Sequence, residues 1–229
     1  MAMPGETGAL TAGVAVLLVS LAAVVGPLIG IPPWLIALAA GLALAALTAD
    51  AAFFGGRGGH LLAESLPGGL GRLRRIAVHE AAHGLVAQAE TVPVQRVIVG
   101  SWAALQAGLT SGGSTEFELP ASAKMPLSEL RRWSRVLLAG LVAEELIYGA
   151  SIGGADDRAQ LGRLWGLSGY DVGTAQREQR QARREVRRWL DLHRQELEER
   201  ADGLLREAPR FGRPTPPPLL PERPAPARP

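Results

Sequence analysis

The stretch Arg75 to Val86, "RIAVHEAAHGLV", decides the fold of this chain, because it predicts a buried helix that carries two histidines. His79 and His83 are four residues apart, so on a helix their imidazoles project from one face, one turn apart. Both rings can then reach one metal ion, and Glu80 lies beside them, where a carboxylate can take a proton from an activated water. The H-E-x-x-H spacing therefore predicts His79 and His83 as metal ligands and Glu80 as the catalytic base.

The alternative for the two histidines is an ordinary core position, in which backbone or water satisfies each ring. The residues around them are apolar and predict a buried helix: Ile76, Ala77, Val78, Ala81, Ala82, Leu85 and Val86. An unpaired charge such as Glu80 would be costly in that setting. The complete pattern therefore favours a metal site.

A catalytic zinc site needs a third protein ligand and one open position. The chain has no cysteine, so the candidates are His60, His193, Glu144 and Asp157. His60 lies in a glycine-rich stretch, and His193 falls on the apolar stripe of a helix, where a core histidine is the commoner outcome. In the pair Asp156-Asp157, one aspartate suffices to cap a helix and the second is free to reach a cation. The residues alone do not decide whether Glu144 or Asp157 is the third ligand.

The N-terminal region is apolar enough to enter a membrane. From Thr7 to Ala49 there is no charged side chain, a run about twice the ~20 residues that one spanning helix needs. The proline pair in "GIPP" (30–33) cannot continue a helix and indicates a tight turn. We therefore expect a two-helix transmembrane anchor at 9–54, with spans at about 9–30 and 33–54, and no cleaved signal peptide.

The orientation of this anchor follows from the charges beside it. The turn between the spans carries no charge, whereas four basic residues follow the second span: Arg57, Arg72, Arg74 and Arg75. Positive flanks stay in the cytoplasm. We expect a multi-pass protein of the cell inner membrane with a cytoplasmic soluble domain, which disfavours a metal site inside the bilayer.

The remaining chain divides by composition. We expect an N-terminal tail at 1–8, a flexible glycine-rich linker at 55–71, a soluble domain at 72–207 and a disordered proline-rich tail at 208–229. The formal charge is only +2, and the arginines gather largely on one helix, so we expect no nucleic-acid partner.

Within the soluble domain the hydrophobic spacing predicts mainly helices with a small sheet. Helices are expected at about 73–89, 126–148 and 174–206, with a short one after Asp157. Extended segments are expected at 92–100 and 104–112. The fold class is therefore mainly α with a small β-sheet.

Four sequence blocks resemble the peptidase domain of the FtsH family of membrane-anchored, ATP-dependent zinc metalloproteases. They are "AVHEAAHGLVA" (77–87), "PVQRVIVG" (93–100), "AGLVAEELIYG" (139–149) and "GGADD" (153–157), and they stand in the family's order. The amphipathic segment 185–207 resembles the closing helix of that domain. The resemblance covers about 75–207.

This resemblance implies a helical, zincin-like peptidase domain with bound Zn²⁺. It implies His79, His83 and Asp157 as the metal ligands, Glu80 as the catalytic base and Glu144 as a residue that supports a ligand. The edge of the sheet, expected around 104–112, would pair with an extended substrate strand. The substrates would be polypeptides, either membrane proteins or unfolded proteins.

The chain departs from the family in two respects. It lacks the G-x-x-x-x-G-K-[S/T] phosphate loop, and there is no room for an ATPase module between the anchor and His79. Ala82 replaces a glycine, and Leu141-Val142 replace Arg-Ala, which removes a charge. We therefore expect a zinc endopeptidase without its own ATPase, with a homo-oligomer or an ATPase acting in trans as possible partners. The alternative is a non-hydrolytic module that binds or adapts for such an ATPase.

Overall fold

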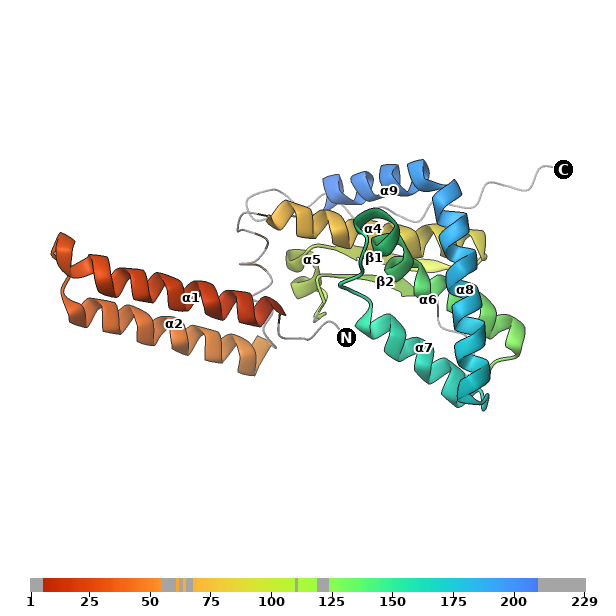
Figure 1. Ribbon diagram of the computed structural model, residues 1–229, viewed down its shortest axis with the longest axis horizontal. Helices are drawn as coiled ribbons and strands as arrows, with labels where there is room; N and C mark the ends of the chain where they lie inside the picture. The colour runs from red at the N-terminus through yellow and green to blue at the C-terminus, as the bar shows by residue number, and fades with distance from the viewer. Residues whose placement is uncertain are drawn as a thin grey trace.

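The structure is a computed structural model that describes residues 6–54, 61, 64, 68–109, 111–118 and 124–209 (Figure 1). His60, the first residues of the predicted N-terminal tail, most of the linker and the proline-rich tail from residue 210 onward lie outside these residues. The fold is mainly helical, at 77%, with a small two-stranded sheet. The predicted fold class is confirmed at this level.

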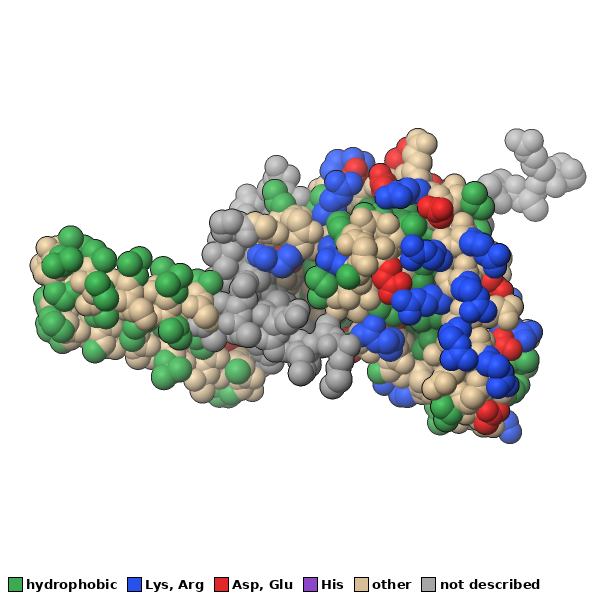
Figure 2. All heavy atoms as spheres, viewed as in Figure 1, with side chains coloured by type: hydrophobic (Ala, Val, Ile, Leu, Met, Phe, Trp, Pro, Cys, Tyr) green, Lys and Arg blue, Asp and Glu red, His purple; other side chains and the backbone are tan. Residues whose placement is uncertain are grey.

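The N-terminal region forms a helical hairpin. Helix α1 (Glu6–Val25) is followed by a short 3-10 turn, η1 (Gly26–Ile29), and by helix α2 (Pro33–Phe54). The chain reverses at Gly30, whose φ of 79° is one that glycine adopts without strain. Hydrophobic side chains are exposed along the hairpin (Figure 2).

One helix of this hairpin, at Pro33–Phe53, is long and apolar enough to cross a membrane. Among the described residues, the apolar stretch in the first half of the hairpin, Gly13–Ile29, is shorter than that. The structure therefore contains one candidate span near the N-terminus, and the second span stays a prediction.

Helix α4 (Gly69–Ala89) is the central element of the helical domain. It begins at Gly69, earlier than the predicted start at Leu73, and contacts α6, α9 and both strands. Its residues from Ala77 to Ala87 are all buried. The predicted histidine helix therefore lies in the core, as its apolar neighbours indicated.

The sheet consists of β1 (Val94–Val99) and β2 (Gly113–Phe117), which pair antiparallel with Val97 opposite Thr115. The prediction of an extended segment at 104–112 is wrong. Helix α5 (Ser101–Gln106) occupies its start, because "WAALQ" consists mainly of good helix formers. The strand follows later, where threonine and phenylalanine favour extended backbone.

Two further helices, α6 and α7, pack against each other. Helix α6 (Leu127–Tyr148) ends at Gly149 as predicted, with the glycine in the left-handed conformation that terminates helices. Helix α7 (Ala155–Leu167) follows after a short loop and packs on α6. Leu130 and Leu137 of α6 and Leu161 of α7 are fully buried, so they fix this packing.

The single helix predicted at 174–206 is wrong, because two helices occupy that range. Helix α8 (Val172–Leu192) packs on α6, helix α9 (Arg194–Glu207) packs on α4, and the chain turns between them at His193 (Figure 1). The apolar stripe predicted for one helix is nonetheless buried in both, as Leu190 and Leu197 show.

Candidate metal centre

His79 and His83 are held from behind by hydrogen bonds to their Nδ1 atoms. His79 Nδ1 lies 2.7 Å from Glu144 Oε1, and His83 Nδ1 lies 2.8 Å from the carbonyl oxygen of Val136. A carbonyl and a carboxylate oxygen only accept, so each Nδ1 carries the hydrogen and donates it. Each Nε2 is thereby left to face the opposite direction with a lone pair that can bind a metal.

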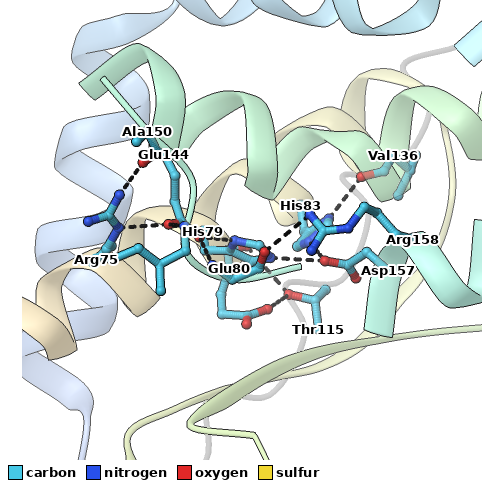
Figure 3. Close-up of polar contacts among 12 residues, drawn as sticks. Arg75, His79, Glu80, His83, Thr115, Val136, Glu144, Ala150, Asp157 and Arg158 are labelled. Carbon is cyan, nitrogen blue, oxygen red and sulfur yellow. Dashed lines mark hydrogen bonds and ion pairs between the residues drawn. The ribbon is translucent and has the colours of Figure 1, made fainter. Parts of the chain in front are cut away.

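Both Nε2 atoms point to one carboxylate oxygen, Oδ2 of Asp157 (Figure 3). The distances are 3.0 Å from His79 and 3.3 Å from His83, and the three ligating atoms lie within 4.8 Å of one another. With both rings neutral, three lone pairs would converge without a hydrogen between them. Such an arrangement requires a cation, and the group His79, His83 and Asp157 could hold a metal ion.

The pKa shifts of His79 and Asp157 also indicate that positive charge is favoured between these side chains. Burial lowers the pKa of His79, but its hydrogen bonds to Asp157 and Glu144 outweigh burial and raise that pKa to about 10. Burial likewise raises the pKa of Asp157, yet the charge of His83 and the hydrogen bonds from both rings hold it well below its usual range. Without an ion, a proton on His79 serves as the cation.

Glu144 and Asp157, the two candidates for the third metal ligand, lie on different sides of the histidines. Asp157 lies in the first turn of α7 and meets the free Nε2 atoms, whereas Glu144 of α6 bonds the rear Nδ1 of His79. Glu144 also accepts from the backbone N–H of Ile152 at 2.9 Å. The geometry therefore places Asp157, and not Glu144, where a third metal donor could stand, while Glu144 holds His79 through Nδ1.

Helix capping does not explain Asp157. The residue before α7 is Gly154, and no side chain caps this helix end. Asp156 is exposed, whereas the Asp157 side chain is only 20% exposed and turned to the histidines. The Asp157 carboxylate is thus directed at the histidine pair.

Glu80 lies beside the ligand group and is fixed by the sheet. It is only 5% exposed, and its Oε2 accepts a hydrogen bond of 2.7 Å from the hydroxyl of Thr115 on β2. Burial raises the pKa of Glu80, although the charges of His79 and His83 oppose the shift. A raised pKa suits a carboxylate that must take up and release a proton near neutral pH.

The other two histidines do not join this group. His60 lies outside the described residues. His193 stacks on Trp189 with 4.0 Å between ring centroids, and its Nδ1 lies 2.8 Å from the Trp189 carbonyl oxygen. His193 therefore lies at the turn between α8 and α9 and is only partly buried, whereas its position on the predicted apolar stripe favoured a core position in one continuous helix.

Sequence reasoning missed the residues that make room for the site. A side chain at Gly113 would contact Glu80 Oε1 at 2.9 Å, and one at Gly153 would contact Glu144 Oε1 at 2.8 Å. At Gly140, a Cβ atom would collide with the ring of His79. Gly140 within "AGLVAEELIYG" was the available signal, since a glycine inside a helix has low propensity and marks a close approach.

Gly140→Ala is expected to weaken the binding of a divalent metal ion such as Zn²⁺ by more than about tenfold while the protein stays folded. Alanine favours the helix by about 1 kcal/mol over glycine, so the loss would come from displacement of the His79 ring. Competition with a chromophoric chelator measures the affinity. Gly162→Ala is the matched control, because that helical glycine has open space around it; equal affinities of both variants would contradict this role of Gly140.

The chain matched no model in a comparison with protein families, and a comparison with curated proteins also gave no match. The residues and their geometry are therefore what defines this site.

Proposed function

We propose that this protein is a membrane-anchored zinc metallopeptidase that hydrolyses peptide bonds without an ATPase of its own. The observation that carries the proposal is the convergence of two imidazole Nε2 atoms and one carboxylate oxygen beside a buried glutamate. Two histidines and a carboxylate suit zinc, and three protein ligands leave a coordination position open for chemistry. The resemblance of the four sequence blocks to the FtsH peptidase domain supports the same class and an FtsH-type fold.

His79, His83 and Asp157 would hold a divalent ion, and that ion would supply the Lewis acidity that peptide hydrolysis needs near neutral pH. The residues of the chain do the rest. Glu80, held by Thr115, takes the proton from the attacking water and delivers it to the leaving amine. Glu144 and the Val136 carbonyl keep His79 and His83 in the tautomer that can bind the ion.

The position of strand β2 is an argument that the substrate is a polypeptide. Among the described residues it pairs only with β1, so its other edge has backbone groups to offer. The Thr115–Glu80 hydrogen bond places this strand next to the catalytic base. An extended peptide that adds to β2 would bring its backbone to the site, which favours unfolded or exposed segments as substrates.

The hairpin supports attachment to a membrane. The candidate span Pro33–Phe53 and helix α1, which carries no charge after Glu6, fit a two-pass anchor in the cell inner membrane. Arg72 and Arg74 beside it favour a cytoplasmic peptidase domain. Arg75, which the sequence placed with that basic flank, instead contacts Glu144.

The two departures from the family blocks are compatible with this function. Ala82 is fully buried and fits its position in α4. Leu141 is buried against Gly154, so the loop that leads to Asp157 packs on an apolar side chain there. The positive charge beside Glu144 comes from Arg75 of the neighbouring helix.

Metal removal tests the proposal. The full chain in detergent is expected to cleave a loosely folded protein such as casein, to lose this activity after treatment with a strong chelator, and to regain it when zinc is added. The reason is that no other described group near Glu80 can replace the Lewis acid. Cleavage that persists after the metal content has fallen to zero would contradict the proposal.

A further inference from the structure

Arg75 lies one helical turn before His79, on the same face of α4, and its side chain is turned toward the site. Its Nε donates to Glu144 Oε2 at 2.7 Å, and its Nη2 donates to the carbonyl oxygen of Ala150. The guanidinium also lies over the ring of Tyr148, 4.7 Å from the centroid. One side chain of α4 thus contacts the end of α6 and the loop that follows it (Figure 3).

Glu144 connects Arg75 to the metal ligands. While Oε2 accepts from Arg75, Oε1 accepts from His79 Nδ1 at 2.7 Å. The backbone N–H groups of Ile152 and Gly153 also donate to this carboxylate, at 2.9 Å and 3.3 Å. The carboxylate therefore holds both a ligand histidine and the loop that leads to Asp157.

The shape of arginine matters in this position. Its planar fork presents donors in two fixed directions, and here one serves the Glu144 carboxylate and the other the Ala150 carbonyl. A lysine has the same charge, but its single ammonium group does not reproduce this geometry. The charge compensates a carboxylate that is almost completely buried, at 3% side-chain exposure.

We propose that Arg75 is a positioning residue of the metal centre: it fixes Glu144, and through Glu144 it sets the tautomer and direction of His79 and the position of the loop before Asp157. The inference rests on the metal site of the proposed function but not on peptide hydrolysis. Without Arg75, Glu144 keeps its backbone donors but loses the side chain that binds Oε2 and neutralises its charge, so its hold on His79 Nδ1, which aims Nε2 at the ion, is weakened.

The test compares zinc affinities of the full chain in detergent, measured by competition with a chromophoric chelator. Arg75→Gln is expected to bind zinc about 10–100-fold more weakly than the wild type. Arg74→Gln removes the same charge from the preceding residue, whose guanidinium is half exposed and pairs with Asp202 at 3.3 Å. This control is expected to bind zinc as the wild type does.

A double-mutant cycle separates positioning from a general charge effect. In a Glu144→Gln background, Arg75→Gln is expected to cause little further loss, because its effect passes through Glu144. An equal loss in both backgrounds, or wild-type affinity of Arg75→Gln, would overturn the inference. Should Arg75→Gln fail to fold, Arg75→Lys decides: weaker zinc binding supports the role of the fork, and unchanged binding refutes it.

The same measurement distinguishes this inference from the proposed function. A wild-type chain that binds no zinc would overturn both. A wild-type chain that binds zinc and is unaffected by Arg75→Gln would overturn only the role of Arg75. Zinc binding that depends on Arg75, without cleavage of casein, would uphold the inference and contradict the peptidase.

Discussion

Glu80→Gln is expected to keep bound zinc and to lose casein cleavage by about 10²–10⁴-fold, the usual contribution of a positioned general base. The amide has nearly the same shape as the carboxylate, and its oxygen can still accept the hydrogen bond from Thr115. It cannot take a proton from water. The candidate ligands His79, His83 and Asp157 are unchanged, so metal content and fold are expected to remain those of the wild type.

Glu129→Gln is the control for this substitution. Glu129 pairs with Arg132 on the surface of α6, with both side chains 38% exposed. Such pairs contribute about 0–1 kcal/mol to stability, so full activity is expected. Wild-type cleavage by Glu80→Gln would contradict the assigned base. A wild-type chain that binds zinc but cleaves nothing would favour the alternative of a binding or adaptor module.

Asp157→Asn is expected to abolish tight zinc binding. The asparagine has no charge, so the two Nε2 atoms of His79 and His83 lose the anionic oxygen they share. Glu144→Gln is expected to weaken binding by a smaller factor, about 10–100-fold, because Glu144 supports a ligand from behind. Chelator competition on the three chains measures the order wild type, Glu144→Gln, Asp157→Asn.

The neighbouring aspartate provides the matched control. Asp156 lies in the same first turn of α7 but is exposed, so Asp156→Asn is expected to bind zinc normally. If Asp157→Asn bound zinc like Asp156→Asn while Glu144→Gln bound none, Glu144 would be the third ligand and the present assignment would be wrong.

The part of the site that lies on one helix was predictable from the sequence. A four-residue spacing on a helix fixes the relative direction of two side chains, so His79, Glu80 and His83 follow from the pattern alone. Asp157 lies 74 residues after His83 on another helix. Its choice over Glu144 needed the family resemblance, because both carboxylates come close to the histidines and only tertiary packing decides which one faces Nε2.

The supporting residues depend on tertiary contacts that no local pattern encodes. Thr115 reaches Glu80 only because β2 is at 113–117 and not at 104–112, where the strand was expected. Arg75 looked like part of a basic membrane flank, since its partner Glu144 is 69 residues away. His193 carries no breaking signal such as glycine or proline, so the turn between α8 and α9 was missed.

The atoms that surround bound zinc test the central claim most directly. X-ray absorption at the zinc edge, on the full chain loaded with equimolar zinc, is predicted to show the imidazole nitrogens of His79 and His83 and light oxygen donors at about 2.0–2.2 Å, with no sulfur. A chain that takes up no zinc, or a zinc shell without imidazole, would contradict the assignment of His79, His83 and Asp157 as a metal centre.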